Sequence, residues 1–245
     1  LVLAWDFHRR PPRPHPPTRL PPERLWGGTL AGLRYAWHAE TILAQLVRTA
    51  AYSAAGSALW ALLPVIGQQR LGLGAAGFGG LMACLGTGAV AAGLTIGPLR
   101  QRLGLERLVA VCCVIFAAVM AVAALSRWAL PVYLALVAGG GAWMAVMNTF
   151  NTATQTSAPP WVRSRATAMH VLSALGPFAL GSALWGMVAG LLGLQAALVL
   201  AAALMLANLL LARHFPLRLG ALHEVTPAPF KDLLVADAPD PEAGP

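Results

Sequence analysis

Charged residues are scarce in this sequence, and acidic residues are nearly missing from its middle. Only 11% of the 245 residues are charged, against about 25% in an average soluble protein. Between Glu40 and Glu224 the single acidic residue is Glu106. A chain this poor in charge, with 58% hydrophobic residues, is typical of a membrane protein and not of a soluble domain.

Cysteine is rare as well. Cys84, Cys112 and Cys113 lie inside apolar stretches, with no histidine or carboxylate at metal-ligand spacing. The sequence therefore predicts buried free thiols, with no disulfide, no metal site and no cofactor. The apolar stretches contain no carboxylate, and His170 stands alone near the end of one of them. We therefore expect no catalytic residue and no enzyme activity.

The positive charge is spread along the chain in small groups. The net charge is +8, and the arginines sit between apolar runs without forming a continuous basic face. This distribution favours loops that face anionic lipid, so we expect the lipid bilayer and not nucleic acid as a partner.

Six apolar runs follow one another after residue 40. Each is close to the length of about 20 residues that crosses a bilayer as a helix, and a helix is required there because backbone polar groups must be satisfied internally. We place them at Leu43–Ile66, Ala75–Leu99, Leu108–Leu125, Ala129–Thr154, Ala166–Ala189 and Leu194–Ala212. The sequence thus predicts an all-α membrane protein with six transmembrane helices.

Three regions are expected along the chain. Residues 1–40 would hold the last turns of a preceding helix, a basic proline-rich linker and an amphipathic segment, Leu30–His38, that lies along the membrane or is an ordinary loop. Residues 41–213 would form the six-helix bundle. Residues 214–245 would be a tail, proline-rich and acidic at its end.

Arginine placement predicts the orientation. Of the 17 basic residues, only Arg70 and Arg127 fall on one side, and fifteen fall on the other, which the positive-inside rule assigns to the cytoplasm. Both termini are then cytoplasmic. Arg48 lies about one turn inside the first run, and we interpret it as an interface anchor whose side chain reaches back to the membrane surface.

Polar residues form a stripe on two of the runs. Such stripes either hydrogen-bond between helices or line a water-filled cavity. The third and sixth runs are apolar nearly all round and would suit exposure to lipid. The stripes consist of Gln45, Thr49, Ser53, Ser57 and Trp60 on the first run, and of Asn148, Asn151 and Gln155 on the fourth.

Glycines mark possible close contacts between helices, although each signal is weak in a chain with 25 glycines. The candidates are Gly86, Gly88, Gly93, Gly97, the triplet Gly139–Gly141, Gly186 and Gly190. The connector Gly97–Gly104 is basic and is predicted to form a turn at the membrane surface.

Several of these segments resemble the carboxyl-terminal half of a major facilitator transporter, most closely the secretion-effector group that includes enterobactin-exporter-like proteins. The resemblance spans Pro22 to Arg218. It rests on the order of Glu23–Trp26, Gly32–Tyr35, Ser57–Pro64, Gly97–Gly104, Asn151 with Gln155, Trp161–Arg165 and Gly181–Gly186. The chain departs at Gln101, where the family's loop motif has an aspartate, and at Pro160, where an acidic residue is frequent.

The resemblance implies one half of a twelve-helix fold that moves substrate between two six-helix halves by alternating access. It implies a multi-pass protein of the cell inner (plasma) membrane that exports small organic molecules and works with an amino-terminal half. The alternative is a six-helix structural or assembly subunit without a transport path. Cavity candidates are Ser53, Ser57, Trp60, Asn148, Asn151 and Gln155, and candidates for cytoplasmic gating loops are Gly97, Arg100, Arg102, Gly104, Arg163 and Arg165.

Overall fold

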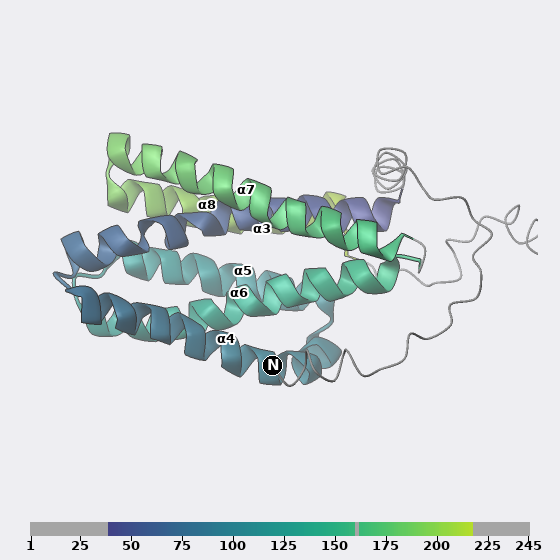
Figure 1. Ribbon diagram of the computed structural model, residues 1–245, viewed down its shortest axis with the longest axis horizontal. Helices are drawn as coiled ribbons and strands as arrows, with labels where there is room; N and C mark the ends of the chain where they lie inside the picture. The colour runs from purple at the N-terminus through teal and green to yellow at the C-terminus, as the bar shows by residue number, and fades with distance from the viewer. Residues whose placement is uncertain (1–38, 160–161, 218–245) are drawn as a thin grey trace, which may run out of the picture.

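The structure, a computed structural model, describes residues 39–159 and 162–217 as a bundle of long helices (Figure 1). Six of them are long and apolar enough to cross a membrane, and the described residues contain no strand. The helices are α3 (Glu40–Val65), α4 (Ala75–Leu103), α5 (Leu105–Leu125), α6 (Ala129–Ser157), α7 (Arg163–Leu192) and α8 (Leu194–His214). The predicted fold class is confirmed. The amphipathic segment Leu30–His38 lies outside the described residues.

Successive helices run in opposite directions through short turns. The π-helical turn η1 (Ile66–Arg70) continues α3. Gly104 joins α4 to α5 with φ of 75°, and Gly193 joins α7 to α8 with φ of 87°. Both glycines adopt left-handed backbone conformations that other residues rarely take. We name the end where α3, α5 and α7 begin the arginine end, which is on the right in Figure 1.

The predicted connector at the arginine end is mostly helix. α4 continues to Leu103 with Pro98 inside it, so Gly97, Arg100 and Arg102 lie on its last turns and only Gly104 lies in the turn. A helix does not have to stop where the apolar run stops, and arginines are favourable near a helix C-terminus. Gly104 ends this helix.

The first residues after the α6–α7 connection are also helical, although Arg163 and Arg165 were expected in a gating loop. Arg163 and Arg165 lie in the first turn of α7. All four arginines assigned to gating loops therefore project from helix ends, where the helix backbone fixes their spacing.

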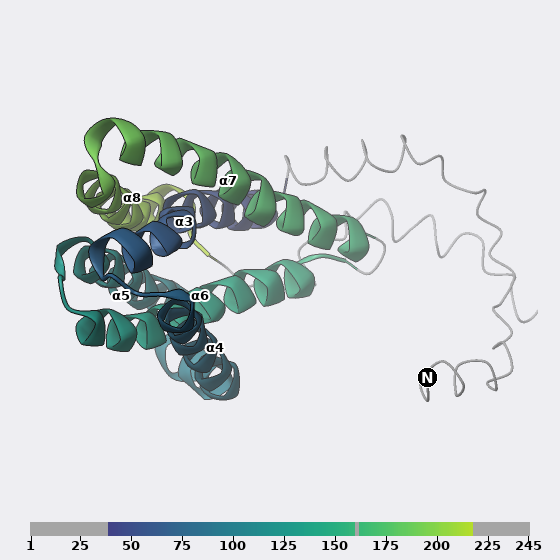
Figure 2. The ribbon, with the colours of Figure 1, turned by 60° about the vertical axis from the view of Figure 1, so that its left-hand side comes forward.

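The packing relates two three-helix repeats, α3–α5 and α6–α8, by a symmetric pattern of contacts. α3 packs most extensively on α7, and α4 packs most extensively on α6. When α3, α4 and α5 are matched in order to α6, α7 and α8, the pair α3/α7 becomes the pair α6/α4. The same contact between repeats therefore occurs twice. α5 packs on both α6 and α8. In Figure 2, α7 and α8 lie on one side of the bundle and α4 on the other, with α3, α5 and α6 between them.

Burial differs from the expectation that the third run faces lipid. In α5, 56% of the most apolar segment is buried inside the bundle, whereas the values are 22% for α4 and 11% for α7. The prediction for α5 is wrong because an all-round apolar helix suits a bundle interior as well as lipid. α4 and α7 have the largest uncovered apolar faces.

Two glycines allow α4 and α6 to pack close together. A Cβ atom on Gly88 would overlap the backbone carbonyl of Val137, and one on Gly140 would overlap the carbonyl of Leu85. Of the other candidates, Gly139 lies against Val119 and Gly141 lies against Gly88. Gly86, Gly93, Gly97, Gly186 and Gly190 have open space at the Cβ position, so these five do not mark contacts within this bundle.

Candidate functional site

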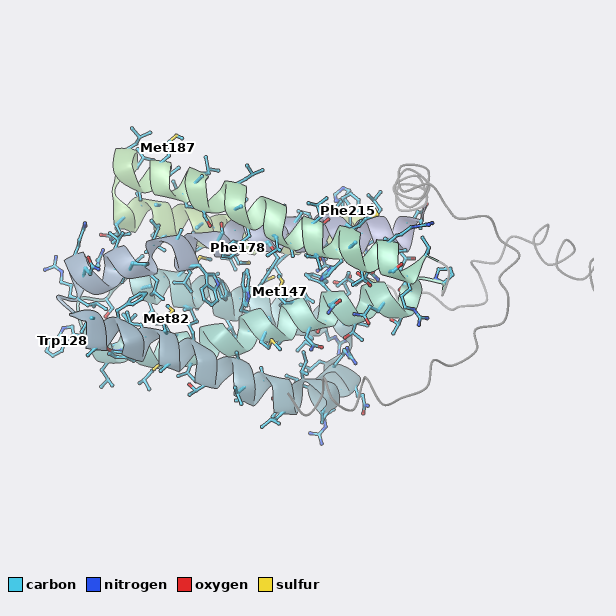
Figure 3. All side chains as sticks on the ribbon, in the orientation of Figure 1. Met82, Trp128, Met147, Phe178, Met187 and Phe215 are labelled. Atoms are coloured by element: carbon cyan, nitrogen blue, oxygen red, sulfur yellow. The ribbon has the colours of Figure 1, made fainter. Side chains whose placement is uncertain are left out.

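Five aromatic rings gather where the two repeats meet, and we call them the aromatic cluster. Trp143 of α6 lies at its centre, with ring centroids 5.4 Å from Tyr52, 6.0 Å from Trp60, 5.6 Å from Phe116 and 5.9 Å from Phe178. The rings come from α3, α5, α6 and α7. Figure 3 shows Phe178 between the ribbons of α7 and α6, with Met147 on α6 nearby. Sequence reasoning selected only Trp60 of these five.

Gly56 explains why the Trp143 ring fits beside α3. A Cβ atom at Gly56 would lie 2.5 Å from Cζ3 of Trp143, so only glycine leaves space for this ring. Tyr52 and Phe116 are fully buried below it, while Trp60, Trp143 and Phe178 remain partly exposed. The cluster thus has a buried floor and a partly open rim.

Most of the predicted stripe on α3 is buried. Ser57 Oγ donates to the carbonyl of Ala54 at 2.8 Å and lies against Gly181 of α7. Ser53 is also buried, and its Oγ has no hydrogen-bond partner. In this conformation the two serines lie within the helix packing and not on an open surface, whereas Trp60 is partly exposed.

The contact between α3 and α7 contains a feature that sequence reasoning missed. Trp185 Nε1 donates to the Ala54 carbonyl at 2.8 Å, next to the buried Gly181. The tryptophan therefore gives its one donor to the backbone of the partner helix. In the sequence, Trp185 was noted only as part of the segment that carries the family resemblance.

The predicted stripe on α6 stays accessible. Asn148 and Asn151 are partly exposed and Gln155 is exposed. Gln155 Nε2 donates to Asn151 Oδ1 at 2.9 Å, and Thr152 Oγ1 lies 3.3 Å from Asn148 Oδ1. These hydrogen bonds within the helix use only part of the bonding capacity of each amide. The remaining donors and acceptors are available to water or to a ligand. Asn151 also follows Trp143 by two helical turns, which connects this stripe to the aromatic cluster.

Arg48 is not an interface anchor. Its side chain is 4% exposed, and its Nη1 lies 2.7 and 2.6 Å from the two carboxylate oxygens of Glu106. Glu106 also accepts a hydrogen bond from the backbone N–H of Leu217, just after α8. The interpretation of Arg48 from sequence alone is wrong, and its partner could not be recognised because it is 58 residues away. Glu106, the one acidic residue between Glu40 and Glu224, thus connects α3, α5 and the residues just after α8.

Acidic and basic side chains are scarce in the described segments around the aromatic cluster. The segments around the aromatic cluster, residues 49–69, 108–125, 129–157 and 166–192, contain no acidic or basic residue apart from His170. Aromatic faces, amides and hydroxyls can hold an organic molecule by stacking and hydrogen bonding.

Comparison with known proteins gives one assignment. No curated protein shows a significant match to the chain. The sequence profile of the family described as "Transmembrane secretion effector" matches residues 3–245. The six apolar helices and their packing agree with half of a major facilitator fold, and the chain belongs to the transmembrane secretion effector family of major facilitator transporters.

Proposed function

We propose that this protein exports small organic molecules as a secondary active transporter that works by alternating access. The observation that carries the proposal is the exchange of partners between the two repeats, α3 with α7 and α6 with α4. Inverted repeats of this kind underlie the rocking motion of transporters, and the family assignment supports the same role.

We further propose that a second six-helix half completes the transporter. α4 and α7 are the least covered helices of the bundle, and together they offer the area that a second bundle would need. The arginine end is proposed to face the cytoplasm, because it holds Arg48, Arg100, Arg102, Arg107, Arg163, Arg165 and Arg213. The membrane would then be the plasma membrane, with the gating arginines at the inner surface.

Within this scheme the rim of the aromatic cluster and the α6 stripe face the substrate. Trp60, Asn148, Asn151 and Gln155 have the exposure that this role requires. Ser53 and Ser57 would be reached only in another conformation of the bundle. Arg100, Arg102, Gly104, Arg163 and Arg165 would act at the cytoplasmic gate, without any cofactor or catalytic residue.

Transport is tested by measuring accumulation in cells. Cells that express the protein should accumulate less of at least one compound in a panel of small aromatic antibiotics and dyes than matched cells without it. Dissipating the proton gradient and the membrane potential should remove the difference, because secondary transport depends on them. Unchanged accumulation across the panel would favour the structural or assembly subunit.

Cysteine labelling is expected to separate lining residues from packing residues. In the intact protein, cysteines at Asn148, Asn151 and Gln155 should react with a water-soluble thiol reagent, and an exported compound should protect at least one of them. A cysteine at Ser57 should react more slowly, because Ser57 is 0% exposed. Equal reactivity at all four positions would remove the assignment of the α6 stripe.

The same labelling method reports the orientation. A membrane-impermeant reagent added outside the cell should modify a cysteine at Gln68 but not one at Gln101, because these residues lie at opposite ends of the bundle. The reverse pattern would place the arginine end outside.

A further inference from the structure

In the described part of the chain, the end of the bundle opposite the arginine end holds two basic residues, and the fold brings them together. Arg70 is the last residue of η1, and its Nε donates to the Ser126 carbonyl at 3.2 Å. Arg127 follows Ser126 directly in the chain and is exposed. The described residues place no acidic side chain at this end, because Glu40 and Glu106 lie at the arginine end. Two positive charges therefore gather here without a counter-charge from the described residues.

The turn that carries Arg127 also exposes a tryptophan. Trp128 is 78% exposed, and Figure 3 shows it at the end of the bundle, projecting away from the helices. Ser126 Oγ donates to the Trp128 carbonyl at 2.9 Å and accepts from the Trp128 backbone N–H at 3.1 Å, which fixes the shape of the turn. Tryptophan side chains are enriched at the level of the lipid headgroups. The turn thus places Arg127 and Arg70 at the depth of headgroup phosphates.

An uncovered apolar face of α5 leads from this turn into the membrane. Val114, Ala118 and Leu125 are exposed, and their spacing of four and seven residues places them on one side of the helix. The other sides of α5 pack on α6 and α8. One leaflet of the hydrocarbon core is about 15 Å thick, which corresponds to about ten residues of helix. The face from Leu125 to Val114 therefore matches the length of one acyl chain.

We propose that Arg70, Arg127 and Trp128 bind the headgroup of an anionic phospholipid, and that its acyl chain lies along the face of α5 from Leu125 to Val114. Arginine N–H groups pair with phosphate oxygens in parallel hydrogen bonds. Arg70 uses its Nε on the turn, so its two Nη groups remain for phosphate. A zwitterionic headgroup would bring an ammonium group close to two arginines, whereas phosphatidylglycerol brings a negative charge alone. The site therefore favours phosphatidylglycerol over phosphatidylcholine, and it does not rest on the proposed transport function.

The test uses the intact protein in phosphatidylcholine nanodiscs that contain a small, subsaturating amount of a photoactivatable lipid. Two analogues carry the same diazirine-labelled acyl chain, one on phosphatidylglycerol and one on phosphatidylcholine. After illumination, mass spectrometry of peptides locates the adducts. The phosphatidylglycerol analogue should label residues 118–125 several-fold more than the phosphatidylcholine analogue. Arg127→Gln should reduce the phosphatidylglycerol adducts about fivefold, the usual effect of one arginine near an anionic lipid surface.

Matched controls separate this site from general contact with lipid. Arg102→Gln removes an exposed arginine at the arginine end, so it should leave the adducts on residues 118–125 unchanged. Leu204 of α8 is 46% exposed, and the two analogues should label it equally, with or without Arg127. Arg70→Gln should lower both the adducts and the melting temperature, because it also removes the bond to the Ser126 carbonyl. Arg127→Gln should leave the melting temperature unchanged, and it is the deciding variant.

Three results would overturn the lipid site. Equal labelling of residues 118–125 by the two analogues would reduce this face to ordinary contact with the bilayer. Unchanged adducts in Arg127→Gln would show that the arginines do not hold the headgroup. Loss of the adducts on addition of millimolar inorganic phosphate would show that the two arginines select a soluble anion and not a phospholipid.

Discussion

The variant Glu106→Gln is expected to lose about 3 kcal/mol of its free energy of unfolding. The substitution keeps the shape of the side chain but removes its charge, and it leaves Arg48 buried at 4% exposure without a counter-charge. Breaking a buried pair in this way costs about 3 to 5 kcal/mol. Because Glu106 is 37% exposed, we take the lower end of that range. Titration of SDS into mixed micelles measures this free energy for helical membrane proteins.

The two partners should respond unequally. Arg48→Met leaves Glu106, which can be hydrated, so the loss should be smaller than for Glu106→Gln. Combining Arg48→Met with Glu106→Gln should recover part of the stability, because no buried charge then remains. Arg107→Gln is the matched control, since Arg107 is the exposed neighbour of Glu106, and it should change stability by no more than about 0.5 kcal/mol. Equal losses for Glu106→Gln and Arg107→Gln would show that the ion pair contributes nothing.

Gly88→Ala is expected to lower the free energy of unfolding by about 3 kcal/mol, the upper end of the usual cost of overpacking. The added methyl group would overlap the Val137 carbonyl, and a backbone carbonyl cannot move aside as a flexible side chain can. α4 and α6 must therefore separate along their crossing. The same SDS titration measures the loss, and Gly140→Ala should show a similar effect from the other helix.

Gly86→Ala is the control for this prediction. Gly86 lies two residues before Gly88 on α4 and has open space at its Cβ position. Alanine favours helix over glycine by about 1 kcal/mol, so Gly86→Ala should be neutral or stabilising. A similar loss in Gly86→Ala and Gly88→Ala would mean that helix flexibility, and not the contact with α6, accounts for the effect.

The six transmembrane spans could be predicted from the sequence because a bilayer permits few structures other than a helix across it. Apolar runs of this length must be helical, and each of the six predicted spans begins and ends within about four residues of the helix found. The helices mostly run past the predicted spans, as α4 does to Leu103, because the hydrogen bonds of a helix extend into the interface. Apolarity reports where the lipid ends and not where the helix ends.

The pairing of residues could not be predicted in the same way. Arg48 and Glu106 are far apart in sequence, and their contact depends on how α3 and α5 are rotated. Gly86 and Gly88 look equivalent in the sequence, yet only Gly88 faces α6. The spacing of the stripe residues places them on one face of α3, but their partners, such as Gly181 of α7 for Ser57 and Ser157 of α6 for Gln45, depend on the rotation of several helices. The accessibility of the α6 stripe depends on the same rotations.

The ion pair also predicts an order of events during synthesis of the protein. Arg48 is made 58 residues before Glu106, so at about 5 to 20 residues per second the ribosome adds its partner roughly 3 to 12 s later. During that interval α3 carries an uncompensated guanidinium, which favours a shallow position near the lipid headgroups. The arrival of α5 then allows α3 to take its final depth. We therefore expect the first helix of the bundle to complete its insertion only after the third has been translated.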